Sequence, residues 1–268
     1  MTSATTLPVR LASQIELGLG FVSAPRERDE LRSVVYPTAE RAYERYLSKR
    51  TPDDNTPGHE FVVFLDAMLI AEAEGLSLAE RIVVADFCFL HDSYAFRRRT
   101  EGMIRDALSK GNAALAAAMR AENENGRREH MKEGARITDE ILRELQRPDD
   151  LRERTVSIVA RHDCWKLGEP HPLGADTVAC VCFEADVLYP LHPIGVLADL
   201  ERPDEDGAPK DVTAPREWRH QIEHSVTTLR KYRANWANTD EQFQDDQTIF
   251  RTAEGFRLYQ AWCEFWGL

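Results

Sequence analysis

The amino-acid sequence predicts an all-α protein built as a helical bundle. Long apolar runs lack glycine and proline, one helix start carries a capping box, and no alternating apolar and polar stretch of strand length stands out. The 268 residues can bury a sizeable core. We predict one domain over 1–268, with an N-terminal helical extension (1–55), a core (56–200) and a C-terminal helical segment (201–268).

Composition and charge narrow the class of protein. Hydrophobic residues make up 43% and charged residues 30%, as in ordinary soluble domains. The net charge of -12 disfavours nucleic-acid polymers and anionic membranes, although a small anion can enter a locally positive pocket. The N-terminus does not resemble a signal peptide, and no apolar run approaches the roughly 18 residues of a membrane helix. We therefore expect a cytoplasmic protein that does not enter a membrane.

The five cysteines do not predict a disulfide framework or a zinc ribbon. Their number is odd and no CxxC pair is present. Cys180 and Cys182 are two residues apart, which puts them on different faces of a helix. We interpret them as small core residues.

The first third of the chain predicts two helices separated by a break. Residues 32–49, RSVVYPTAERAYERYLSK, favour a helix, and 50–58 are rich in turn-forming residues. The run 61–74, FVVFLDAMLIAEAE, is typical of a buried helix that stops at Gly75.

The next helix is predicted at both of its ends. Ser77 and Glu80 are spaced for a capping box, in which each side chain satisfies a backbone N–H of the first turn. The apolar run 81–90, RIVVADFCFL, then delivers His91 and Asp92 to the end of the helix.

The middle of the chain continues with helix-forming segments. Residues 102–109 and 112–122 are both good helix formers. The stretch 127–145, RREHMKEGARITDEILREL, predicts a further helix that places His130 on its apolar side and ends before Pro148.

The remaining segments are also interpreted as helical. Asp149 and Asp150 can cap a helix over 151–163, and 174–191, GADTVACVCFEADVLYPL, predicts an apolar helix that contains Asp186. The rest of the chain is predicted to form a Pro- and Asp-rich loop followed by two helices, at 201–217, 217–237 and 253–266.

Imidazole and carboxylate side chains interrupt these apolar helices. Such groups are costly to bury unless something compensates them, and a bound metal ion is a strong compensation. The residues in question are His59, His91, Asp92, His130, His162, Asp163 and Asp186. A mixed shell of imidazole nitrogen and carboxylate oxygen suits a divalent transition metal better than calcium or magnesium.

The order of these residues resembles that of the HD-domain superfamily of metal-dependent phosphohydrolases. The similarity is carried by residues 58–92, which end in LHD, and by HMKEGARITDEIL at 130–142, IVARHD at 158–163 and FEADVLY at 183–189. A single His-Asp pair is a weak signal, but several segments in the right order with matching apolar context are specific. The resemblance implies an HD-like core over 56–200.

The resemblance also implies a ligand set. It assigns a first metal site to His59, His91, Asp92 and Asp186, and completes a second site with His130 and His162, with Asp92 bridging both ions. We expect one or two ions, with Fe or Mn favoured and Co, Ni or Zn as further options. The one-ion alternative stays open, because some family members use the histidines equivalent to His130 and His162 to hold a phosphate.

The implied activity is hydrolysis of a small phosphoester or phosphoanhydride, for which nucleotides are candidate substrates. Two adjacent ions would lower the pKa of a bridging water and generate the attacking hydroxide, with Asp92 and His130 at the catalytic centre. Arg97 with its neighbours Arg98 and Arg99, or Lys166, could orient the phosphate, since guanidinium and ammonium groups match phosphate oxygens. The alternative for the arginines is a solvated basic turn. Glu184 is a candidate partner for a ligand histidine.

Two other functional classes are weighed against hydrolysis. Mixed-valent di-iron oxygenases, which cleave C–H, C–C or C–P bonds of small polar substrates, share the same scaffold and ligands. The segment 249–266 is similar to the end of a group of bacterial HD hydrolases and favours hydrolysis. A non-catalytic scaffold would have no reason to keep the full ligand set.

The remaining histidines and the aromatic C-terminus have simpler interpretations. His171 and His192 lie in proline-containing loops, and His220 and His224 lack the central glutamate position of a zinc-protease motif and are expected at the surface. Trp262, Phe265 and Trp266 could line a core or the interface of a homo-oligomer.

Overall fold

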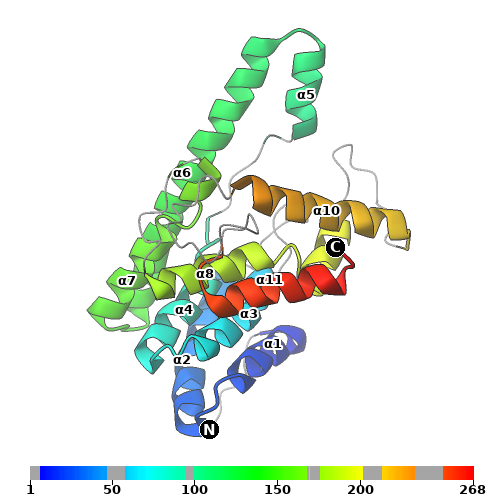
Figure 1. Ribbon diagram of the computed structural model, residues 1–268. Helices are drawn as coiled ribbons and strands as arrows, with labels where there is room; N and C mark the ends of the chain where they lie inside the picture. Colours follow the sequence, from blue (N-terminus) through cyan, green and yellow to red (C-terminus); the bar gives the residue numbers. More distant parts are fainter. Residues whose placement is uncertain are drawn as a thin grey trace.

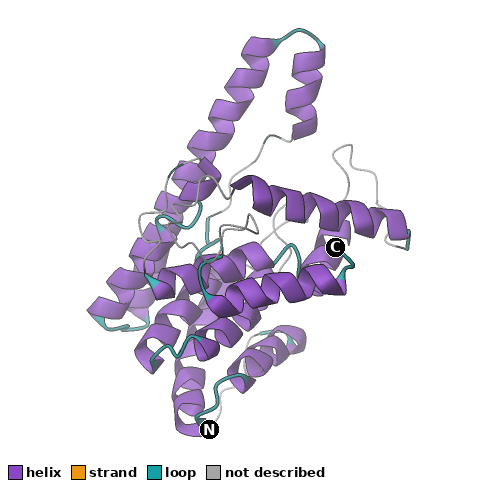
Figure 2. Cartoon of the chain, in the orientation of Figure 1, coloured by secondary structure: helices purple, strands orange, loops and turns teal. Residues whose placement is uncertain are grey.

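The computed structural model describes residues 7–46, 58–94, 99, 101–167, 169, 176–201, 213–232 and 250–268. Every regular element in these ranges is helical, which confirms the predicted all-α class (Figure 2). The helices are α1 (Val9–Gly20), α2 (Pro25–Arg45), α3 (His59–Ala73), α4 (Leu78–Leu90), α5 (Glu101–Ser109), α6 (Ala113–Glu144), α7 (Asp149–Val159), the short 3-10 turn η2 (Cys164–Leu167), α8 (Thr177–Leu188), α9 (Pro193–Glu201), α10 (Pro215–Tyr232) and α11 (Ala253–Phe265).

Three apolar helices form the centre of the bundle. Helices α3, α4 and α8 pack against one another, with α1, α2, α7 and α11 around them (Figure 1). Each of the three is buried around most of its circumference, as expected for helices that have neighbours on several sides. The ends of these central helices supply most of the side chains discussed below.

The predicted signals at the ends of α3 and α4 are confirmed. Gly75 follows α3 with φ +69°, a left-handed conformation that glycine adopts without a steric penalty. Ser77 and Glu80 form both halves of the capping box at the start of α4. Helix α4 ends at Leu90, so that His91 is its C-cap residue.

Helix α6 is longer than the sequence suggests. The two helices predicted over 112–122 and 127–145 are one continuous helix of 32 residues. Its first half has only one buried residue, Ala116, and together with α5 it projects from the body as a helical hairpin (Figure 1). The side-chain amide of Asn123 exchanges two hydrogen bonds with the backbone of Arg99, of 2.7 and 2.9 Å, and so ties the polar middle of α6 to the segment that precedes α5.

The N-terminal region contains more helix than predicted. Helix α1 was not anticipated, because its apolar residues are interleaved with polar ones; Leu11, Ile15 and Leu19 form its buried stripe. Helix α2 begins earlier than expected, at Pro25, and continues through Pro37, which would ordinarily break a helix. Its packing against α4 outweighs the loss of one backbone hydrogen bond.

Other boundaries also differ from the predictions. Pro148 is the N-cap of α7, and Asp149 and Asp150 lie inside its first turn, where their charge favours the positive end of the helix dipole. The segment predicted as a loop around His192 leads directly into α9. Helices α10 and α11 are present where two C-terminal helices were expected.

The principal hydrophobic core draws on all three parts of the chain. Its buried residues include Ile15 and Leu31 near the N-terminus, Phe64 in the centre, and Phe250 and Leu258 near the C-terminus. None of the described helices is both long and apolar enough to cross a membrane.

A buried ion pair links α2, α4 and the turn between α6 and α7. Arg147 donates to both carboxylate oxygens of Asp86, at 2.7 and 3.0 Å, and to the hydroxyl of Thr38 at 3.0 Å. Thr38 in turn donates to Asp86 at 2.8 Å. Asp86 is fully buried and Arg147 nearly so. The pair therefore joins segments that are far apart in sequence.

Removal of Arg147 should be strongly destabilising, because Asp86 would be left buried without its countercharge. We expect Arg147→Met to lower the free energy of unfolding by about 3–5 kcal/mol in a urea titration. Arg45→Met is the control, since the ion pair of Arg45 with Glu144 is exposed and its loss should cost less than about 1 kcal/mol. Equal losses in the two variants would contradict the assignment.

The buried carboxyl of Asp66 should make the stability of the protein depend on pH. Burial raises the pKa of this carboxyl from 3.8 to about 8. Between pH 3.8 and pH 8, Asp66 keeps its proton in the folded protein but has lost it in the unfolded chain. The free energy of unfolding therefore falls by about 1.4 kcal/mol for each pH unit in this range, and it levels off above pH 8. Asp66→Asn does not titrate. Its stability relative to wild type should therefore rise between pH 5 and 8, measured by urea unfolding; a constant difference would refute the buried neutral carboxyl.

Candidate metal centre

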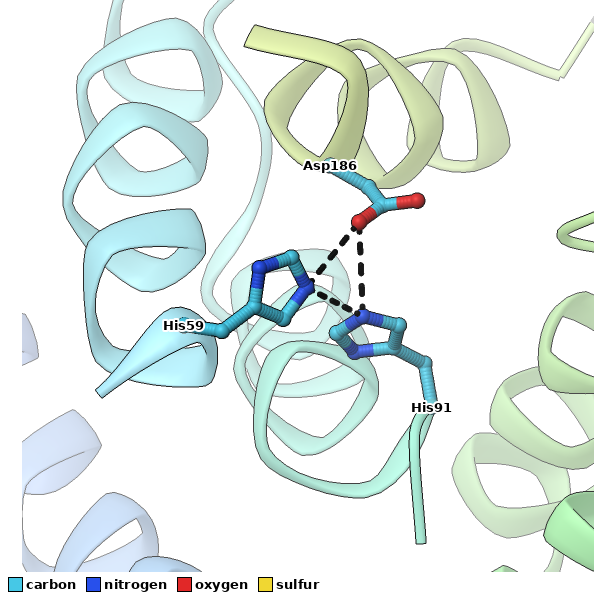
Figure 3. A group of neighbouring side chains, drawn as sticks. All are labelled: His59, His91 and Asp186. Carbon is cyan, nitrogen blue, oxygen red and sulfur yellow. Dashed lines mark hydrogen bonds and ion pairs between the residues drawn. The ribbon is translucent and has the colours of Figure 1, made fainter. Parts of the chain in front are cut away.

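Six of the residues singled out in the sequence converge at one end of the central helices. They form two groups of three, in each of which one ligand-capable atom per residue lies within 4.8 Å of the others. The first group is His59, His91 and Asp186, and the second is Asp92, His130 and His162. The side chains of the first group point toward a common centre from three helices (Figure 3).

The first group is assembled at helix ends. His59 is the first residue of α3 and follows Gly58, whose φ of +138° is accessible to glycine but strained for other residues. His91 caps the C-terminus of α4, and Asp186 lies in the last turn of α8. The Nε2 atom of His59 is 3.2 Å from Nε2 of His91 and 3.1 Å from Oδ1 of Asp186.

The second group combines the end of α4 with two further segments. Asp92 follows His91 directly, His130 lies within α6, and His162 lies just after α7. The Nε2 atoms of His130 and His162 are 3.1 Å apart, and Oδ1 of Asp92 is 3.2 Å from Nε2 of His130.

A glycine allows α6 to approach the end of α4. A Cβ atom at Gly134 would lie 3.2 Å from the carbonyl oxygen of His91, a tight contact that would require the neighbouring backbone to shift by a few tenths of an ångström. Gly134 is one turn beyond His130 on the same helix. The small residue thus helps to bring the two groups together.

The backbone fixes the orientation of three of the four imidazole rings. His91 Nδ1 is 3.0 Å from the carbonyl oxygen of Cys88, and His162 Nδ1 is 2.8 Å from that of Val159. His130 Nδ1 contacts the carbonyl oxygen of Tyr94. Because a carbonyl can only accept, each Nδ1 carries the proton and, in the neutral ring, Nε2 presents a lone pair.

This arrangement fits a metal ion. Neutral His130 and His162 direct two lone pairs at each other across 3.1 Å, which is repulsive unless a cation shares the space. Imidazole nitrogens held by backbone carbonyls, next to carboxylate oxygens, are the usual surroundings of a bound transition metal. The two buried groups could therefore bind metal ions.

Asp92 connects the two groups. Its Oδ2 atom is 3.7 Å from Nε2 of His59, while its Oδ1 atom faces the second group, at 3.7 Å from Nε2 of His162. Oδ1 is also 3.8 Å from Nε2 of His91. The carboxylate thus lies between the two sets of imidazoles, as the predicted bridging role requires.

The carboxylates and imidazoles shift each other's protonation in the metal-free protein. Burial alone would raise the pKa of Asp92, but the neighbouring His91, His130 and His162 outweigh it and hold that pKa well below its usual range. For His91, burial also disfavours the charged form and would by itself lower the pKa. The neighbouring carboxylates of Asp92 and Asp186 outweigh this effect and raise the pKa of His91 to about 9. In the absence of a metal ion, the positive charge that balances these carboxylates therefore comes from protonated imidazole.

The predicted basic residues have different outcomes. Lys166 lies at the centre, with Nζ 4.0 Å from Oδ2 of Asp186 and 2.6 Å from Oδ1 of Asp163. Burial lowers the pKa of Lys166, but these two carboxylates outweigh it and raise the pKa, so the side chain stays charged. Arg97 and Arg98 lie outside the described residues. Arg99 forms an ion pair with Glu122 on α6 at 2.8 Å.

The other singled-out residues lie elsewhere. His192 packs against Trp262, and burial lowers its pKa to about 4. His220 and His224 are exposed on α10, as expected, and His171 lies outside the described residues. Cys180 and Cys182 are buried in α8, as predicted.

Two residues correct the reading of the sequence around the site. Glu184 does not contact a ligand histidine: it accepts hydrogen bonds from the backbone of Arg251 and Thr252, at 2.5 and 3.0 Å, and so anchors the start of α11 to α8. Arg127, which was not singled out, forms an ion pair with Asp163. Its position three residues before His130 places both on one side of α6, a spacing that could have indicated it.

Compared with known protein families, with curated proteins and with solved structures, the chain matches none.

Metal binding should strengthen with pH, because a metal must displace protons from the imidazoles. Since the pKa of His91 is about 9, we expect the apparent affinity for Mn²⁺ to rise up to about tenfold per pH unit between pH 6 and 8 for each proton displaced. Calorimetric titration of the metal-free protein measures this. His91→Ala should greatly weaken binding, and the exposed His224→Ala should not; pH-independent binding would contradict imidazole ligation.

Proposed function

We propose that this protein is a metal-dependent hydrolase of a small phosphoester or phosphoanhydride, with nucleotides as candidate substrates. One observation carries the proposal: the carboxylate of Asp92, a member of the second group, directs Oδ1 to His130 of its own group and Oδ2 to His59 of the first group. A carboxylate so placed can hold two cations at once, and paired cations are typical of phosphoryl-transfer sites.

The donor set indicates which ions the centre would take. His59, His91 and Asp186 would hold one ion, and His130 and His162 a second, with Asp92 shared. Four nitrogen and two carboxylate donors favour Fe or Mn, with Co, Ni or Zn as further options. When bound, such ions would acidify a water molecule and stabilise negative charge on a phosphoryl group.

Residues next to the metal-capable side chains also fit this chemistry. The side chain of His91 is fully buried, whereas those of Asp92 and Asp186 are 15% and 10% exposed, so the two carboxylates are the ligands nearer to solvent. His91 is stacked on Phe87, whose side chain is fully buried in the apolar core. Lys166, beside Asp186, is placed to orient an anionic group.

The resemblance to HD-domain proteins favours the same activity. Its ligand order, His, His-Asp, His, His and Asp, is the order of the six converging residues. The same set is compatible with a mixed-valent di-iron oxygenase, so the decisive experiment has to distinguish a reaction that needs oxygen from one that does not.

We expect protein loaded with Mn²⁺ or Fe²⁺ to release phosphate from members of a nucleotide and sugar-phosphate panel equally well with and without oxygen. Asp92→Ala, which removes the shared ligand, should lower kcat/KM more than about 100-fold and reduce bound metal. His224→Ala serves as the control and should retain activity.

The opposite outcome is equally defined. Oxygen consumption on a candidate substrate, together with the EPR signal of a coupled mixed-valent iron pair, would assign the oxygenase instead. Full activity of Asp92→Ala would refute the shared-ligand role.

A further inference from the structure

The sequence contains a second His-Asp pair whose aspartate has a different role from the first. Asp163 follows His162 as Asp92 follows His91, yet Asp163 belongs to neither group of converging ligand atoms. It is directed instead to two basic side chains: Oδ1 is 2.6 Å from Nζ of Lys166, and Oδ2 forms an ion pair with Nη1 of Arg127.

The two cations come from different elements and meet at Asp163. Arg127 precedes His130 by one turn of α6 and is therefore next to the second group. Lys166, on η2, approaches Asp186 of the first group to 4.0 Å. Asp163 is the common partner that fixes both.

Exposure shows which part of this cluster can meet a ligand. The side chain of Asp163 is 5% exposed, whereas those of Arg127 and Lys166 are 14% and 28% exposed. The carboxylate is thus the buried anchor, and the cations form the more accessible layer. Arg127, Lys166 and Asp163 together carry a formal charge of +1, on a chain whose net charge is -12, and the carboxylate of Asp186 lies 4.0 Å from Lys166.

We propose that Asp163 is a positioning residue that holds Lys166 and Arg127 as a subsite for a phosphate or phosphoryl group. The inference rests on the proposed function and names the charge of its substrate. A lysine stem is flexible and loses entropy when it is fixed; anchoring its ammonium to a buried carboxylate removes much of that loss before the ligand arrives. Uncharged polyols gain little from such a pair, so the subsite selects anionic substrates.

Inorganic phosphate is the probe that tests the subsite. We expect calorimetric titration of the Mn²⁺-loaded protein to show phosphate binding, and Lys166→Met to weaken it at least about tenfold without changing bound metal. Lys110→Met is the matched control, because Lys110 is exposed and pairs with Asp106 in the helical hairpin. Its affinity for phosphate should equal that of the wild type.

Asp163→Asn separates positioning from simple electrostatics. Removal of a negative charge should tighten anion binding if Asp163 acts only through its field. We expect the reverse, phosphate binding weakened at least about tenfold, with partial recovery in Asp163→Glu. Tighter or unchanged binding in Asp163→Asn overturns the proposal. If this variant does not fold, Asp163→Glu tests the positioning role: weakened phosphate binding supports it, and tighter or wild-type binding overturns it.

The outcomes for the subsite and for the hydrolase can be told apart. If wild-type protein hydrolyses phosphoesters but does not bind phosphate, or if Lys166→Met binds it as wild type does, the subsite is wrong and the hydrolase stands. If phosphate binding depends on Lys166 and Asp163 while no phosphoester is hydrolysed, the subsite stands and the hydrolase is wrong. Loss of metal in Lys166→Met would show that the cluster is structural and overturn the subsite.

Discussion

The mutual approach of imidazole nitrogens is the constraint on which the rest of this structure depends. Nitrogen atoms of paired rings lie 3.1 and 3.2 Å apart in a buried space, and three of the four rings are oriented by backbone carbonyls. Such a cluster is stable only with positive charge between its members, supplied by protons or by metal ions. The surrounding helices are arranged so that this charge has carboxylates beside it, from Asp92 and Asp186.

The fold achieves this by placing reactive groups at the ends of otherwise apolar helices. Helices α3, α4 and α8 bury nearly all of their surface. Their metal-capable residues lie where α3 begins and where α4 and α8 end. The energetic cost of a polar cluster is thereby confined to one end of the bundle. The body of the bundle is held by hydrophobic packing and by the buried Asp86–Arg147 pair.

Residues with strong local signals were predictable, and those determined by distant contacts were not. The capping box at Ser77 and the stop at Gly75 act within one turn, so they fixed α3 and α4 correctly. Helix α1 packs against α3 and was not predicted, because the local sequence does not contain this contact. The six residues expected to form the site do converge. The contacts of Glu184 with Arg251 and Thr252, and the ion pair of Asp163 with Arg127, join segments that are far apart in sequence and were not predicted.

The wide spacing of the converging residues has a consequence for biosynthesis. They extend from His59 to Asp186, so a growing chain exposes the first imidazole well before the last carboxylate leaves the ribosome. At ordinary elongation rates this interval is on the order of ten seconds. The first group is therefore complete only after the α8 segment has been translated, and a nascent chain released before residue 186 would lack its carboxylate.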